Sequence, residues 1–309
     1  MALTLHGATG ERSRLGVTRH GSCCQLCSMS LPSRFNIVVI DPPGYRFAHF
    51  LFDTARFLQG AIEECGYPCS VRRNDVERGA INVLVGVHLI DDPRWAFGLL
   101  ASEVPYVVLQ TEIITEGGFN LERAGRFESV FLPLVRGAAA VWESSQPNLE
   151  ALEALGLAPG FLRFGYVEAI RERLRPAERD LDFFFCGSAT PHRRSVLQKL
   201  ASLGYRVEVR FDDAAFFRND LMARSEVLVT LRQSDELTHV PAARILHAVN
   251  NGCLVAGEHG VSGESVEDLY VWEEGGDTIE LLRETRARTD RRTLADEHFS
   301  RLRKRPMRD

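Results

Sequence analysis

Short apolar runs alternate with longer amphipathic segments along most of this chain, and this alternation constrains the fold more than any other feature. In the first half, the predicted strands cover 35–40, 69–73, 81–89, 106–112, 138–145 and 161–168, and the predicted helices cover 48–66, 92–103, 129–137 and 146–157. The run at 35–40 is nearly continuous in apolar residues, which is typical of a strand buried on both faces. Strand–helix alternation of this kind predicts a mostly parallel sheet covered on both faces by helices.

The same alternation starts again after a charged linker over 169–181, which carries Pro176. In the second half, the predicted strands cover 182–188, 205–211, 227–233 and 253–258, the predicted helices cover 191–204, 213–226 and 240–252, and a charged tail over 278–306 is predicted to be helical. The pattern therefore predicts an α/β protein built from two halves. Open parallel sheets bind ligands at the carboxyl ends of their strands, so we expect a small-molecule site in the cleft between the halves.

Composition excludes several classes of protein. The chain has 309 residues, which suits two domains, and its 37 basic and 42 acidic residues give a net charge of −5, so no basic field indicates nucleic-acid binding. No apolar run approaches the ~18 residues that a membrane span needs. The odd number of cysteines, seven, favours a reducing, cytoplasmic setting.

The residues at 1–33 lack periodicity and predict a disordered leader. They contain His20, Cys23, Cys24 and Cys27, but the spacing is poor for a structural zinc site and argues against one.

The stretch Asp180–Phe211 joins a buried strand to a basic helix through small residues. Gly187 and Ser188 let a ligand approach the backbone, and the following helix start offers free N–H groups and the positive end of the helix dipole. Arg193 and Arg194 add permanent charge within two turns, so the stretch suits a phosphate or diphosphate. An ordinary strand-to-helix turn with a solvated basic face explains the same residues. The absence of G-x-G-x-x-G and of a P-loop lysine weighs against dinucleotide binding and ATP hydrolysis.

A second stretch, His239–Glu258, carries a helix, a glycine stop and a buried strand. Arg244 lies within that helix, and Glu258 lies where the strand meets its loop. Together the two stretches resemble the donor half of glycosyltransferases with the GT-B fold, in which a similar helix–glycine–strand segment holds the nucleotide sugar. In the first half, "VVLQTE", "AAVWESSQPNLEALEALGL" and "GYVE" are similar to bacterial GT-B-like proteins of the CgeB type and of glycosyltransferase group 1. The resemblance covers Asn36–Val271 in order and spacing.

This resemblance implies two Rossmann-like domains that face each other across a cleft. It implies an acceptor-side domain over 34–170 and a nucleotide-sugar-binding domain over 171–309, whose terminal helix crosses back to the first. The implied activity moves a sugar from a nucleotide diphosphate sugar to the hydroxyl of an unknown acceptor (a glycan, a protein or a small molecule), with no metal or other cofactor. A catalytically inactive scaffold and a nucleotide-sugar epimerase remain as alternatives.

The candidate site residues come from both halves. Those expected to bind the donor are Gly187, Ser188, Arg193, Arg232, Arg244, His247 and Glu258. His247 stands where many such enzymes carry a glutamate, which leaves its contact with the sugar open. His49 or Glu112 is expected to be the base that activates the acceptor hydroxyl, because each follows a first-half strand at the edge of the cleft. The simpler role for either residue is a cap or a loop contact.

Overall fold

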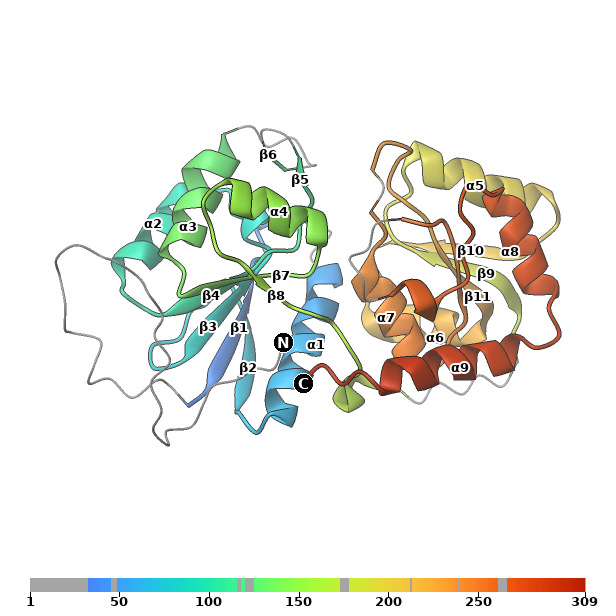
Figure 1. Cartoon of the computed structure of the whole chain (residues 1–309), viewed down its shortest axis with the longest axis horizontal. Coiled ribbons are helices and arrows are strands. Elements are labelled where there is room, and N and C mark those ends of the chain that lie inside the picture. Colours follow the sequence, from blue (N-terminus) through green and yellow to red (C-terminus); the bar gives the residue numbers. More distant parts are fainter. Residues whose placement is uncertain are drawn as a thin grey trace.

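The structure is a computed structural model that describes residues 33–45, 49–115, 118–119, 125–172, 178–211, 213–237, 239–260 and 266–308. The leader predicted over 1–33 lies outside these residues, except for its last position. The two halves form separate parallel sheets, the first in the blue-to-green lobe of Figure 1 and the second in the yellow-to-red lobe. The predicted α/β fold with two Rossmann-like halves is confirmed.

Among the described residues, the first sheet has the strand order β2-β1-β3-β4-β7-β8, and every pair of neighbours is parallel. Its elements are β1 (Phe35–Val39), α1 (His49–Glu64), β2 (Cys69–Arg73), β3 (Ile81–Val85), η1 (Val87–Leu89), α2 (Pro93–Ala101), β4 (Tyr106–Leu109), η2 (Phe127–Phe131), α3 (Leu132–Gly137), β7 (Ala140–Glu143), α4 (Gln146–Ala154), β8 (Gly160–Phe161) and η3 (Glu168–Ile170). A small antiparallel ribbon joins β5 (Ile114–Thr115) and β6 (Gly118–Phe119).

The second sheet has the order β10-β9-β11-β12, again parallel throughout the described residues. Its elements are β9 (Leu181–Cys186), α5 (Pro191–Ser202), β10 (Val207–Arg210), α6 (Ala215–Arg224), β11 (Ser225–Thr230), α7 (Ala242–Asn250), β12 (Val255–Gly257), η4 (Glu267–Leu269), α8 (Thr278–Ala287) and α9 (Arg291–Arg303). In both sheets the strand order reverses beside the first strand of the half. Such a reversal opens a crevice at the carboxyl ends of the strands, where ligands bind.

Two predicted strands are shorter in the structure than in the sequence pattern. The strand expected over 81–89 ends at Val85, because Gly86 has a positive φ of 86° and turns the chain into η1. A Cβ at Gly86 would lie 2.5 Å from Cδ1 of Leu51, so the absence of a side chain lets α1 pack closely on this turn. Of the strand expected over 161–168, only Phe161 lies in β8, because the chain then leaves the first sheet.

The C-terminal segment returns to the first half. After α9 the chain runs toward α1 (Figure 1). There the backbone N–H of Tyr166 donates to the carbonyl of Arg305 at 2.8 Å, and the backbone N–H of Met307 donates to the carbonyl of Tyr166 at 2.9 Å. Gly165 makes room for this contact, since a Cβ there would lie 2.3 Å from the Arg305 carbonyl oxygen. The return of the tail thus ties the second half to the first.

Candidate functional site

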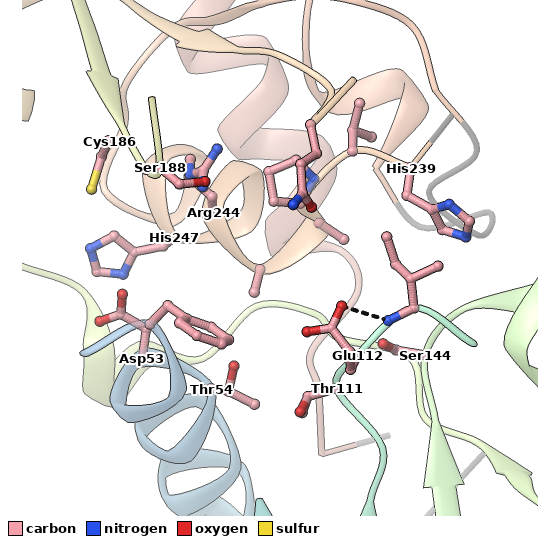
Figure 2. Close-up of a pocket in the computed structure, with 18 of the residues that line it drawn as sticks. Asp53, Thr54, Thr111, Glu112, Ser144, Cys186, Ser188, His239, Arg244 and His247 are labelled. Carbon is pink, nitrogen blue, oxygen red and sulfur yellow. Dashed lines mark hydrogen bonds between the residues drawn. The ribbon is translucent and has the colours of Figure 1, made fainter. Parts of the chain in front are cut away.

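A cavity of about 800 Å³ lies between the two halves. The first half contributes α1 and the loops that follow β4 and β7, and the second half contributes the end of β9 and the starts of α5 and α7. Figure 2 shows residues from the two halves facing each other across it, with Asp53 and Glu112 opposite Ser188 and Arg244. The cavity therefore occupies the place where the two parallel sheets predict a ligand site.

The turn after β9 brings Gly187 and Ser188 to the cavity wall. Gly187 has φ 152°, and a Cβ there would lie 2.5 Å from Nη2 of Arg244. A side chain is strained at this φ, and its Cβ would press on the Arg244 guanidinium, so glycine suits the turn that the arginine approaches. Ser188 accepts a hydrogen bond from Nη1 of Arg193 at 2.9 Å, so its hydroxyl already has one partner within the chain.

Arg193 lies in the wall of the cavity, but its guanidinium is already bonded to the chain. Nε donates to the carbonyls of Leu231 and Arg232 at 3.2 and 2.8 Å, Nη2 donates to Leu231 at 3.0 Å, and Nη1 donates to Ser188. Burial, together with the charge of Arg244, lowers the pKa of Arg193 to about 10. Arg193 thus ties the turn after β9 to the end of β11, and its direct contact with a ligand stays a prediction.

Arg244, by contrast, has an unsatisfied donor. Its Nη1 is buried and has no hydrogen-bond partner among the described residues, while the side chain lines the cavity. Its Cζ lies 5.3 Å from the centroid of the Phe185 ring. The Cζ of Arg193 lies 5.5 Å from the same centroid. Burial lowers the pKa of Arg244, because the surroundings disfavour its charge. A buried guanidinium donor without an acceptor is costly, so this geometry suits an anionic ligand.

The start of α7 adds to the same site. Its N-cap is Pro241, which makes no side-chain capping bond, and Val240 to Arg244 all line the cavity. The first N–H groups of a helix have no partner within the helix, and the dipole makes this end positive. The uncapped start of α7 and Arg244 therefore converge on one region that favours negative charge.

Glu258 and Arg232 are not among the residues that line the cavity. The Glu258 carboxylate accepts the backbone N–H of Arg232 at 2.7 Å and lies 2.7 Å from Nε2 of His192. His192, which the sequence did not single out, also lies 3.1 Å from a carboxylate oxygen of Asp235. These contacts hold the loop after β11 against the start of α5. The predicted contacts of Glu258 and Arg232 with the donor are left as predictions.

His247 lines the cavity where the two halves meet. Its Nε2 lies 3.3 Å from Nη2 of Arg218 and 3.2 Å from Oδ1 of Asn219, and burial lowers its pKa to about 4, so the ring is neutral at pH 7. Arg218, on α6, forms a two-pronged ion pair with Asp53 of α1. The sequence contained no signal for this pair, because its members are 165 positions apart. The cluster joins the halves beside the cavity.

The opposite wall is a hydrogen-bonded acidic network. Glu112, the predicted base, lines the cavity and accepts the N–H of Ile113 at 3.0 Å with its own carboxylate. Asn148 donates to the carbonyl of Glu112 and to Oε2 of Glu143, both at 2.9 Å. Glu143, the last residue of β7, also lines the cavity and was not among the residues predicted from the sequence. A carboxylate that ends a buried strand was the available signal.

Two further histidines, His49 and His239, were considered as groups at the cavity. Helix α1 begins at His49, whose side chain lies outside the described part of the structure, so its predicted role as a base is untested. His239 lines the cavity, and within the described chain neither of its buried ring nitrogens has a hydrogen-bond partner. Burial lowers its pKa, which keeps the ring neutral.

Across the described ranges, no three His, Cys, Asp or Glu side chains are grouped so as to hold a metal ion. In the same ranges no helix has the length and apolar character needed to cross a membrane.

Comparison with known proteins supports the architecture and leaves the sequence family open. No family model and no curated protein matches the chain. A solved alpha-glucosyltransferase in complex with UDP and a 13-mer DNA containing a central A:G mismatch is similar, with a TM-score of 0.54 and 10% identity over 88% of this chain and 94% of its own. An alpha-glucosyltransferase in complex with UDP and a 13-mer DNA containing a HMU base has a TM-score of 0.51 and 10% identity, over 87% and 95%.

AviGT4, a glycosyltransferase involved in Avilamycin A biosynthesis, covers 88% of this chain and 98% of its own at 15% identity, but its TM-score of 0.46 is too low to carry an argument. The similarity to a CgeB type stays a prediction. The fold is shown by the two parallel sheets, by the cavity between their strand ends, and by the two alpha-glucosyltransferase structures. The chain therefore has the GT-B architecture, with two Rossmann-like domains that face each other across a cleft.

Proposed function

We propose that this protein is a glycosyltransferase that moves a sugar from a nucleotide diphosphate sugar to an acceptor hydroxyl. One observation carries the proposal: Arg244 lines the interdomain cavity with a buried Nη1 that has no acceptor among the described residues. The uncapped start of α7 lies at the same place. A diphosphate would satisfy both, because its oxygens accept hydrogen bonds and carry the opposite charge.

The two similar alpha-glucosyltransferases were solved with UDP, which makes a uridine nucleotide the first donor to test. Their complexes also contain DNA. For this chain the net charge of −5 favours an acceptor other than nucleic acid, such as a glycan, a protein or a small molecule. The CgeB-like grouping and a hexose as the transferred sugar belong to this proposal as well.

In the proposed reaction, the donor diphosphate binds against Arg244 and the start of α7. The bond between the anomeric carbon and the phosphate oxygen breaks, and the leaving diphosphate gains negative charge. Arg244 stabilises this charge with a fixed guanidinium, which is electrostatic catalysis by a preorganised group. We expect the reaction to need no metal, so turnover measured with and without EDTA should agree. Closure of the two domains would exclude water from the cavity.

Calorimetric titration with UDP, GDP and dTDP and with their glucose derivatives tests the proposal. We expect saturable binding of one nucleotide by the wild-type protein and a loss of at least about tenfold in affinity for Arg244→Ala, the effect of removing one charge-assisted hydrogen bond. Arg194→Ala is the matched control, because Arg194 is exposed on α5 and does not line the cavity. Absence of binding by every nucleotide would contradict the proposal and favour a scaffold role.

A further inference from the structure

Glu143 is a buried carboxylate at the edge of the reaction cavity. It is the last residue of β7, its residue exposure is 1%, and it lines the cavity. Its Oε1 accepts hydrogen bonds from the backbone N–H groups of Ser144 and Ser145 at 2.6 and 2.8 Å, and its Oε2 accepts one from Nδ2 of Asn148 at 2.9 Å. The carboxylate is therefore held in one orientation. Because Oε2 has one partner among the described residues, it can accept a hydrogen bond from one more donor.

The environment of Glu143 differs from that of a structural buried carboxylate. Buried carboxylates are normally paired with a cation, but within the described chain Glu143 has only uncharged hydrogen-bond donors as partners. Burial raises its pKa to about 7, and the hydrogen bonds from Asn148, Ser145 and Ser144 counteract only part of this effect. A carboxyl group with this pKa is a stronger base than an ordinary glutamate and is still half ionised at neutral pH.

The charged side chains on the elements packed around β7 do not contribute to the shift in the pKa of Glu143. They are Glu112 after β4, Glu150 and Glu153 on α4, and Arg163 after β8. Burial and hydrogen bonding are the causes of the shift in the pKa of Glu143, and no charge is among them. Across the cavity, Arg244 and His239 belong to the donor side. The raised pKa of Glu143 thus depends on burial and hydrogen bonds within the first half.

We propose that Glu143 is the general base of the transfer, with Asn148 as the residue that positions it; this inference rests on the proposed function. Oε2 takes the proton of the acceptor hydroxyl. The hydroxyl oxygen donates its electron pair to the anomeric carbon and forms the new glycosidic bond. The bond to the phosphate oxygen breaks, and the nucleoside diphosphate leaves with that electron pair. The proton on Glu143 then passes to solvent.

This assignment replaces Glu112 in the role of base and gives it a different task. One carboxylate oxygen of Glu112 accepts the N–H of Ile113, and the other lies 3.6 Å from Nε2 of His88. Its backbone carbonyl accepts Asn148, the same amide that holds Glu143. The Glu112 loop thus supports Asn148, and Asn148 in turn orients the base.

The test combines Glu143→Gln, Asn148→Ala and the exposed control Glu150→Gln from α4. The probe is UDP-glucose, or whichever of the GDP and dTDP sugars binds, with water or added sugar as the acceptor. Nucleoside diphosphate release is measured from pH 5 to 9, and the donor Kd is measured by calorimetry for each variant. Infrared difference spectra of wild type against Glu143→Gln follow the protonated carboxyl band directly, without any substrate.

We expect Glu143→Gln to bind the donor within about twofold of wild type but to turn over about 10²–10⁴-fold more slowly, the usual contribution of a general base. The wild-type rate should rise with pH and level off near pH 7, the pKa of Glu143. Asn148→Ala should move the rise in the pH–rate profile about one pH unit higher, because it removes a hydrogen bond that favours the ionised form of Glu143. Glu150→Gln should behave as wild type.

Donor binding with an unchanged rate and pH profile in Glu143→Gln would overturn the assignment of the base and leave the proposed function intact. A carboxyl band that titrates near pH 4.5 would also overturn it. Failure of the wild-type protein to bind any nucleotide sugar would instead reject the proposed function, on which this inference rests.

Discussion

Replacing Arg244 by methionine should stabilise the protein without nucleotide and destabilise it relative to wild type with nucleotide. Methionine keeps the length and much of the apolar packing of the arginine side chain. The change removes the buried Nη1, which has no partner among the described residues. An unsatisfied buried donor costs about 1–3 kcal/mol, whereas the lost cation–π contact with Phe185 was worth about 0.5–2 kcal/mol.

The expected net change is a rise of about 1 kcal/mol in the free energy of unfolding without ligand. The order should reverse with UDP at about 100 times its wild-type Kd. This concentration stabilises wild type by about 2.7 kcal/mol, whereas a tenfold weaker affinity leaves Arg244→Met a gain of about 1.4 kcal/mol. Urea denaturation with and without UDP measures both values.

Arg193→Met is the matched control, because Arg193 approaches the same Phe185 ring from 5.5 Å but has its donors satisfied by chain oxygens. It should lose about 3 kcal/mol of stability in both conditions, since it leaves buried carbonyls without partners. If Arg244→Met destabilises the ligand-free protein and keeps the full gain from UDP, then Arg244 is a structural residue and the reasoning about the anion site is refuted.

Three further predictions concern the cavity walls. The folded pKa of Glu143 is about 7 against an ordinary value of 4.5, so the stability that its proton provides is complete below pH 4.5 and is lost as pH rises through 7. Wild type should lose about 2.5 kcal/mol relative to Glu143→Gln between urea melts at pH 5 and pH 8, and parallel curves would contradict the shift. Gly187→Ala should lower the free energy of unfolding by about 1–3 kcal/mol and weaken UDP binding, because the new Cβ would collide with Arg244; unchanged thermal melting and calorimetry would argue against this packing. Asp53→Asn should cost about 3 kcal/mol in urea melts by leaving Arg218 without its anionic partner, and a change below 0.5 kcal/mol would mean that the pair does not join the halves.

The order of the strands and helices could be predicted because their signals are local. The apolar run of β1 and the amphipathic pattern of α1 each depend on a few neighbouring residues, and both elements formed where they were expected. The short β8 and the turn at Gly86 departed from the pattern, since each depends on contacts with a distant part of the chain.

The sequence placed polar groups at the strand ends but could not rank them. Glu143 is the last residue of β7, and Glu112 follows the end of β4. The sequence pattern led to a prediction for Glu112 and not for Glu143. Glu143 became the stronger candidate for the base because its wall of the cavity buries it and supplies only uncharged partners, among them Asn148. Burial of this kind depends on how α4 packs on β7, which periodicity does not encode.

By itself, the sequence determined that the chain is an α/β protein of two halves, because hydrophobic periodicity and glycine stops act over short stretches. The cavity lies at the strand ends, where the pattern predicted a ligand site. The sequence presented Arg193 and Arg244 as equivalent cations in the second half. The folded structure separates them: the acceptors of Arg193 lie 38 and 39 positions away, in the segment after β11, whereas Nη1 of Arg244 meets no acceptor in the described chain. Whether a charge is satisfied depends on groups brought together from distant positions, and only folding brings them together.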